Sequence, residues 1–397
     1  MNNSIRPQYE TTSEWVHISF AETSAFKSVY GFAGSLGTVH LEGVRYLPKG
    51  VPSKTLVIYM HPATTLQLLP MPRAMAAAGF HVLCAGSRYA RNDSALIMEN
   101  VVVDLGAYIR HAKTVWGYEK VVLAGWSGGG SLALLYQSQA ERPSITHTPA
   151  GDPCHIMTAG LMPADAFIFQ AAHVSRAVTF ADWIDPSVID ENNPDLRDPE
   201  LDIYNPDLLP PYSAEFMHRF RQAQLARIRR RTEWVKHTLE GLRKSGGKEM
   251  ERGFVTHRTM AEPRFLDPLL DPNDRPIGTC FMGDPETANN GPVGLARFST
   301  LRSWLSQWSP DDTHAHGETC AAGITVPMLS IEHTADDAVP QPHTHRIHTA
   351  SASLDKTMVA IGGANHYFVG QPGLLEQAVE LCSDWMHDRH LTWVAMK

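Results

Sequence analysis

One serine lies among small residues at the end of an apolar run. Residues 121–130 read Val-Val-Leu-Ala-Gly-Trp-Ser-Gly-Gly-Gly, and a helix-forming segment, 131–137, follows at once. A G-x-S-x-G turn between a strand and a helix lifts the serine hydroxyl clear of the sheet, at the positive end of the helix. Gly125 and Gly129 suit such a turn because a Cβ at either position would crowd it. The pattern predicts that Ser127 attacks an electrophilic carbon.

The same glycines allow two other interpretations. A glycine-rich turn after a strand can be only a turn, or it can cradle a phosphate. The phosphate interpretation is weak because no lysine follows these glycines and G-x-G-x-x-G is absent. The flanking strand and helix signals favour a catalytic serine.

A serine hydroxyl needs a base within hydrogen-bond reach, and the base needs a carboxylate to orient it. Two later strand-like segments run into loops that carry such groups. Residues 326–332 lead to His333-Thr334-Ala335-Asp336-Asp337, and residues 356–361 lead to Gly362-Gly363-Ala364-Asn365-His366. The chain order is serine, then acid, then histidine, as a triad on a strand–turn–helix scaffold of this kind requires.

With these residues in this order, the chain resembles the α/β-hydrolases over about the first 170 and the last 75 residues. Residues 333–336 are similar to the family's G-x-x-D loop, with His333 in place of glycine, and residues 363–366 are similar to its G-x-x-H loop. The resemblance implies Ser127 as nucleophile, His366 as general base and then acid, and no cofactor. It implies Asp336 as the orienting carboxylate by its fourth position in the loop, with Asp337 as the rival.

An oxyanion hole needs two N–H donors aimed at one point. The resemblance implies the amide of Gly128 as one donor, and a second in the turn after the strand 55–60. There the chain reads His61-Pro62-Ala63-Thr64-Thr65, where the family commonly has His-Gly. Proline has no N–H, so Ala63 or Thr64 is predicted to supply the second donor. Candidates for substrate contact, with packing as the alternative role, are Trp126, His61 and Tyr367.

Alternating strand and helix signals surround these residues. Period-two segments at 14–20 and 37–47 predict an antiparallel ribbon, and continuous apolar runs at 55–60 and 81–85 predict strands buried on both faces. Helical periodicity at 70–78, 96–116 and 374–389, with a strand at 164–170, completes the alternation. We therefore expect an α/β fold, with a mostly parallel sheet flanked by helices.

The alternation breaks between residues 174 and 322, which are rich in proline and charge and include a helical stretch at 214–243. We expect residues 1–173 and 323–397 to form the hydrolase core and residues 174–322 to form a largely helical cap inserted after the sixth strand. The cap's aromatic residues could shape an apolar site or form the cap's own core; they include Trp183, Trp234, Phe254, Phe265, Phe281, Trp304 and Trp308.

Composition limits the partners. The net charge of -8 over 397 residues argues against a dedicated nucleic-acid binder, and no apolar run is long enough to cross a bilayer. Residues 1–7 lack the features of a signal peptide, and five scattered cysteines indicate reduced thiols, so a cytoplasmic location is expected. Histidines 343, 345 and 348 lack an accompanying H-E-x-x-H or Cys-His set, so no metal site is expected.

The triad predicts a serine hydrolase that works through an acyl-enzyme. Its substrate class, a small, apolar carboxylic ester or lactone, is implied only by the resemblance to the family. The same triad would also serve a thioesterase, an amide hydrolase, a C–C bond hydrolase or an acyltransferase. A non-catalytic hydrolase-like binding protein is a further alternative. Oligomeric state stays open, a homodimer included. Arg88 could meet an anionic substrate, although a structural ion pair is favoured.

Overall fold

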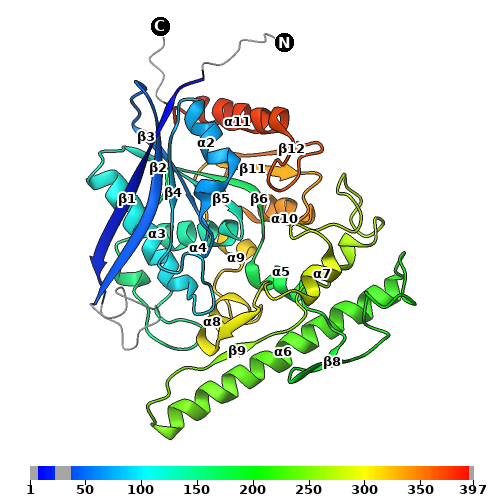
Figure 1. Ribbon diagram of the computed structural model, residues 1–397. Helices are drawn as coiled ribbons and strands as arrows, with labels where there is room; N and C mark the ends of the chain where they lie inside the picture. The colour runs from blue at the N-terminus through cyan, green and yellow to red at the C-terminus, as the bar shows by residue number, and fades with distance from the viewer. Residues whose placement is uncertain (1–7, 23–36, 393–397) are drawn as a thin grey trace.

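The computed structural model describes residues 8–22 and 37–392, so the expectation for residues 1–7 lies outside it. Within these ranges one eight-stranded sheet has the order β1-β2-β4-β3-β5-β6-β11-β12 (Figure 1). The pairs β1–β2 and β2–β4 are antiparallel, and each later neighbouring pair is parallel. The strands are β1 (Thr11–Ala21), β2 (Thr38–Pro48), β3 (Thr55–Met60), β4 (His81–Ala85), β5 (Lys120–Ser127), β6 (Ala166–Ala172), β11 (Met328–His333) and β12 (Lys356–Ile361). The predicted mostly parallel α/β sheet is confirmed.

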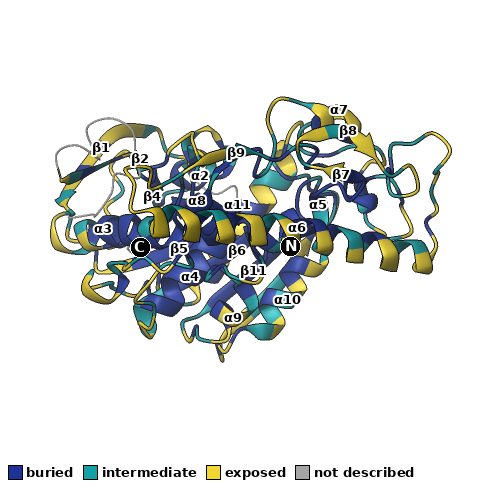
Figure 2. Cartoon of the chain, turned by 90° about the horizontal axis from the view of Figure 1, so that it is seen from below, coloured by how far each residue is buried: buried dark blue, intermediate teal, exposed yellow. Residues whose placement is uncertain are grey.

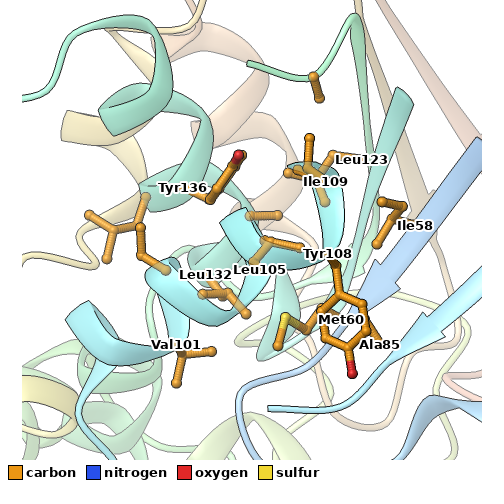
Figure 3. Packing of buried hydrophobic residues seen from close by; sticks show 14 of the residues in the cluster. Ile58, Met60, Ala85, Val101, Leu105, Tyr108, Ile109, Leu123, Leu132 and Tyr136 are labelled. Carbon is orange, nitrogen blue, oxygen red and sulfur yellow. The ribbon is translucent and has the colours of Figure 1, made fainter. Parts of the chain in front are cut away.

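Helices cover both faces of the sheet because the central strands send alternate apolar side chains to opposite sides. Ile58 and Met60 join one cluster, with Leu105 and Tyr108 from the covering helix (Figure 3). Val57 joins the cluster on the other face. The first face is covered by α3 (Met98–Thr114), α4 (Gly129–Glu141), α9 (Gly317–Ala321) and α10 (Pro342–Ala350), and the second by α2 (Pro70–Ala77) and α11 (Pro372–His387).

An insertion follows the sixth strand, as predicted, and its longest element is α6 (Ala214–Ser245). Ser213 caps α6 by accepting a hydrogen bond from the Phe216 amide, and Gly246 ends it with a φ of 60°. The helix runs below the sheet in Figure 1, and many of its residues are exposed in Figure 2. The other elements are α5 (Arg176–Trp183), α7 (Pro285–Asn290), α8 (Leu301–Gln307), β7 (Val188–Asp190), β8 (Asn193–Arg197), β9 (Gly253–Val255) and β10 (Phe298–Thr300). Short 3-10 turns lie at Leu66–Leu68 and Ile156–Thr158, before the insertion, and at Pro263–Phe265 within it.

The insertion has apolar clusters of its own. Trp304 and Trp308 are fully buried and each packs edge-on against Phe180 of α5. Phe254 packs against both Trp234 and Trp304. Phe180, Trp304 and Trp308 therefore belong to the insertion's core and Phe254 packs against it, whereas Trp234 is exposed. No helix in the described part of the chain combines the length and the apolar character that crossing a bilayer needs.

A buried carboxylate joins distant parts of the insertion. Asp185 is fully buried, and its Oδ2 accepts hydrogen bonds from Arg258 Nε at 2.6 Å and Asn289 Nδ2 at 2.9 Å. Its Oδ1 accepts from the amide and hydroxyl of Ser187 at 2.9 and 2.6 Å. Both oxygens are satisfied, as burial of a charge requires.

Replacing Asp185 with alanine should lower the free energy of unfolding by about 3–5 kcal/mol, because Arg258 Nε, Asn289 and Ser187 would all lose their buried partner, although Arg258 keeps its ion pair with Asp202. Urea denaturation followed by circular dichroism measures the change. Asp311→Ala is the control, since its ion pair with Arg229 is exposed and should leave the urea midpoint unchanged. An Asp185→Ala midpoint equal to that of the wild type would contradict the prediction.

Candidate active site

Ser127 lies in a sharp turn between β5 and α4. It is the last residue of β5, its φ is 53°, and α4 begins two residues later at Gly129. A Cβ on Gly129 would lie 2.4 Å from the carbonyl oxygen of Met60, and one on Gly125 would lie 2.8 Å from the Cα of Gly130. The turn is therefore compatible only with glycine at these positions. Its geometry matches the strained strand–turn–helix predicted for the serine.

His366 and Asp336 are hydrogen-bonded on the loops that follow β12 and β11. The Nδ1–H of His366 donates to Asp336 Oδ2 at 3.0 Å, and both side chains are buried. Asp336 Oδ1 accepts the amides of Ala338 and Val339 at 2.8 and 2.7 Å. Burial alone would raise the pKa of Asp336, but His366 and the amide hydrogen bonds outweigh it and hold this pKa below its ordinary value.

This pairing sets the state of the imidazole. With Nδ1 donating to a carboxylate, the neutral ring has its lone pair on Nε2. Nε2 is buried and has no hydrogen-bond partner among the described residues. The ring lies against Trp126 and Tyr367, with centroid distances of 4.5 and 4.7 Å. His366 can therefore accept a proton at Nε2.

Asp337, the rival carboxylate, has different contacts. Its Oδ1 is buried without a hydrogen-bond partner among the described residues, and its backbone carbonyl accepts the amide of Phe281 at 2.8 Å. Burial raises the pKa of Asp337, and the charge of Asp336 raises it further. Of the two candidates, Asp336 makes the hydrogen bond to the imidazole.

A cavity of about 480 Å³ opens beside Ser127. Its volume lies within the range of small-molecule sites. The insertion contributes Trp183, Phe281 and Leu295 to the lining of this cavity. The sequence-predicted residues that line it are Ser127, Gly128, His61, Ala63, Thr64, Trp126 and Tyr367.

Two residues of the cavity whose side chains could take part in chemistry, a histidine and an arginine, were not anticipated from the sequence. His173 and Arg176 follow β6 directly and line the cavity. The Nη2 of Arg176 lies 2.6 Å from Asp93 Oδ2, and His173 Nδ1 lies 2.9 Å from Thr179 Oγ1. Their position after the carboxyl end of a parallel strand was the available signal, since ligands bind along that edge of such sheets.

Arg88 takes the structural role that the sequence favoured. Its Nη2 lies 2.7 Å from Asp104 Oδ1, and its Nη1 pairs with Glu22. All three side chains are nearly buried. The guanidinium is therefore engaged by two carboxylates away from the cavity.

In the turn after β3, two backbone amides are hydrogen-bonded to a side chain of the same turn. The N–H groups of Ala63 and Thr64 both donate to His61 Nδ1, at 3.1 and 3.0 Å. Ala63 and Thr64 were predicted as alternative oxyanion donors, and in this structure both amides are bonded to the imidazole. Burial lowers the pKa of His61 well below its ordinary value, and the charge of Arg176 lowers it further.

The histidines of residues 343–348 have separate neighbours. His343 packs edge-on against His173 at 5.8 Å between ring centroids, and His345 Nε2 lies 2.9 Å from Glu332 Oε2. Over the described ranges, no three histidine, cysteine, aspartate or glutamate side chains are grouped so as to hold a metal ion.

His333, at the position where the family pattern has glycine, should make the stability of the protein depend on pH. It is buried between Gln170 Nε2 at 3.1 Å and the carbonyl of Asn365 at 3.0 Å, and burial lowers its pKa to about 4. An unfolded histidine binds its proton near pH 6.5. The unfolded state therefore binds more protons between these values, and stability must fall as the pH drops from about 6.5 to 4.

Replacing His333 with glutamine should make this decline shallower, by up to about 1.4 kcal/mol per pH unit. The free energy of unfolding in urea, measured at intervals from pH 7 to pH 4.5, checks this. The exposed His218→Gln controls for the loss of an imidazole. Equal slopes for wild type and His333→Gln would show that His333 is not buried in its neutral form.

Comparisons with solved structures find distant likenesses. DcsB, in a complex with its substrate analogue, is 12% identical with a TM-score of 0.49, over 94% of this chain and 99% of that chain. An esterase domain of a Rhodothermus marinus protein is 10% identical with a TM-score of 0.45, over 94% and 98%. An alpha/beta hydrolase superfamily protein from Enterococcus faecalis is 13% identical with a TM-score of 0.41, over 88% and 95%. No family model and no curated protein matches the chain.

The fold is identified by the chain's own topology. The antiparallel pair β1–β2 opens the sheet. The parallel strands follow in the order β4-β3-β5-β6-β11-β12. A strained serine turn joins β5 to α4, and a hydrogen-bonded acid and histidine follow β11 and β12. This protein has the α/β-hydrolase fold.

Proposed function

We propose that the protein is a serine hydrolase that cleaves a carboxylic ester or lactone through an acyl-enzyme. The observation that carries the proposal is the combination of Ser127, on a strained turn beside a cavity of about 480 Å³, with the buried His366–Asp336 pair. A nucleophile, a base with an open Nε2 and an orienting carboxylate are the parts that acyl transfer needs.

In the first half of the reaction, Ser127 Oγ attacks the carbonyl carbon while His366 Nε2 takes the hydroxyl proton. The imidazolium that forms is stabilised by Asp336, whose other oxygen is held by two amides. The carbonyl's π electrons move onto its oxygen, which becomes an oxyanion beside the amide of Gly128. When they return, the C–O bond breaks and His366 delivers its proton to the departing alcohol.

The second half repeats these steps with water. His366 removes a proton from water as the oxygen attacks the acyl-serine carbon. Collapse of the second tetrahedral intermediate breaks the bond to Ser127 Oγ, which takes back the proton from His366. The products are an acid and an alcohol, or one hydroxy acid from a lactone, and no cofactor takes part.

The cavity favours a small substrate with an apolar part. Leu68, Leu69 and Val369 line it together with Phe281 and Leu295. Burial of apolar substrate surface against these side chains would stabilise the complex. We propose on this basis that residues 174–322 act as a cap on a core formed by residues 1–173 and 323–397, because Phe281 and Leu295 lie in the insertion.

Replacing Ser127 with alanine should reduce hydrolysis of an activated short-chain ester to the background rate, because no nucleophile remains. Release of p-nitrophenol measures turnover, and circular dichroism checks the fold. A serine-directed phosphonate should label wild-type Ser127, identified by peptide mass spectrometry. Full turnover by Ser127→Ala, or labelling of another residue, would refute the assignment.

The same substitution at the adjacent Asp336 and Asp337 tests which carboxylate orients His366. Asp336→Asn should lower kcat by about 10⁴-fold, because an amide in place of the carboxylate disfavours the productive tautomer of His366. Asp337→Asn changes a neighbouring side chain that is not the hydrogen-bond partner of the His366 imidazole, and should lower kcat by less than about tenfold. Steady-state kinetics on one activated ester decides between them, and a larger loss in Asp337→Asn would reverse the assignment.

A further inference from the structure

Neither of the backbone amides predicted in the turn after β3 is free to act as the second oxyanion donor. Pro62 has no N–H, and the amides of Ala63 and Thr64 donate to His61 Nδ1. A single donor from Gly128 would leave the oxyanion with half of the usual support. A second N–H group must therefore reach the space beside Gly128.

The hydrogen bonds of the turn fix the protonation of His61. Two backbone N–H groups lie 3.1 and 3.0 Å from Nδ1, so Nδ1 must accept through its lone pair. A neutral imidazole that accepts at Nδ1 carries its proton on Nε2. His61 is therefore an N–H donor at Nε2.

The donor atom lies against Gly128. A Cβ built on Gly128 would be 2.8 Å from His61 Nε2, so glycine at this position leaves room for the ring. Gly128 is also the N-cap residue of α4, beside the first amides of that helix, which have no partners within it. Across residues 8–22 and 37–392, no hydrogen bond engages Nε2 of His61 itself. Both His61 and Gly128 line the cavity that contains Ser127.

Arg176 supports the neutral form of the ring. Its Nη1 would lie 3.4 Å from the same Gly128 Cβ, while its Nη2 is bound to Asp93 at 2.6 Å. A second positive charge on His61 would repel this guanidinium and would break both amide hydrogen bonds at Nδ1. The ring is thus kept as a donor that does not itself exchange its proton during the reaction.

We propose that the Nε2–H of His61 is the second donor of the oxyanion hole, acting beside the amide of Gly128. The inference rests on the proposed serine hydrolase function. As Ser127 attacks, the carbonyl oxygen gains the π electron pair and both N–H groups donate to it. No proton passes to the oxygen, and the electron pair returns when the leaving group departs.

The kinetic test compares wild type, His61→Ala and His61→Gln on one activated ester. His61→Ala should lower kcat by about 10²–10³-fold with KM changed by less than about threefold, because the donor acts on charge that develops in the transition state. Glutamine offers an N–H in place of Nε2–H, so His61→Gln should recover at least tenfold of the loss. A His61→Ala kcat within threefold of wild type would overturn the inference, as would equal losses for both variants.

Binding of a boronic acid gives a second readout. Its adduct with Ser127 is tetrahedral and places a negatively polarised oxygen where the oxyanion forms. His61→Ala should weaken boronate binding by the same factor as kcat and leave binding of the product acid within threefold. A parallel loss of product binding would indicate a merely structural role and refute the proposal.

His81→Gln is the matched control. His81 begins β4, at the opposite edge of the sheet from the site, and hydrogen-bonds to Tyr118 and to the carbonyl of Val51. Its loss should leave kcat within threefold of wild type. If the His61 variants fail to fold, ¹⁵N NMR of wild-type histidines still decides, since the inference requires His61 protonated at Nε2 and a downfield shift of that proton on boronate binding. A proton on Nδ1 would refute it.

These experiments distinguish a failure of the His61 role from a failure of the proposed serine hydrolase function. Wild-type protein with neither turnover nor phosphonate labelling of Ser127 would refute both. Wild-type turnover and labelling, with kcat unchanged in His61→Ala, would refute the role of His61 alone.

Discussion

The close approach of the serine turn to the end of β3 is the constraint on which the site depends. The backbone of Gly129 passes so near Met60 that a Cβ would meet the Met60 carbonyl oxygen at 2.4 Å. Because β3 and β5 are hydrogen-bonded parallel neighbours, their carboxyl ends reach the same edge of the sheet. The contact places Ser127 beside the His61 turn, and the backbone of Ser127 has a φ of 53° there. A larger residue at Gly129 would move Ser127 away from that turn.

The rest of the site follows from strand order. In the sheet, β6, β11 and β12 follow β5 as parallel neighbours. The loops after them therefore begin at the carboxyl ends of the strands, where Ser127 also lies. The loops after β11 and β12 bring Asp336 and His366 together, and residues just past β6 supply His173 and Arg176 to the cavity. Each group is placed by a rigid strand and oriented by a short loop, which favours a preorganised site.

The sequence predicted what depends on local pattern. Strands β3 and β12 have the predicted bounds, and α6 begins at the predicted residue, because continuous apolar runs and long helical periodicity are strong signals. The chain order of serine, acid and histidine indicated which loops meet. Side-chain direction could not be read from sequence: the bonding of Ala63 and Thr64 amides to His61 depends on the rotamer of one ring. His173 and Arg176 were missed because residues after β6 carry no spacing motif.

Several imidazoles lie near Ser127, and the proposed mechanism requires only His366 to become charged. His61, His173 and His333 are buried, and burial lowers the pKa of each, to about 3 for His173 and about 4 for His333. Their ring nitrogens contact amides, a hydroxyl or a backbone carbonyl. His366 differs because its Nδ1 meets the carboxylate of Asp336. The Asp336 carboxylate therefore orients the His366 ring, while burial favours the neutral form of His61, His173 and His333 around Ser127.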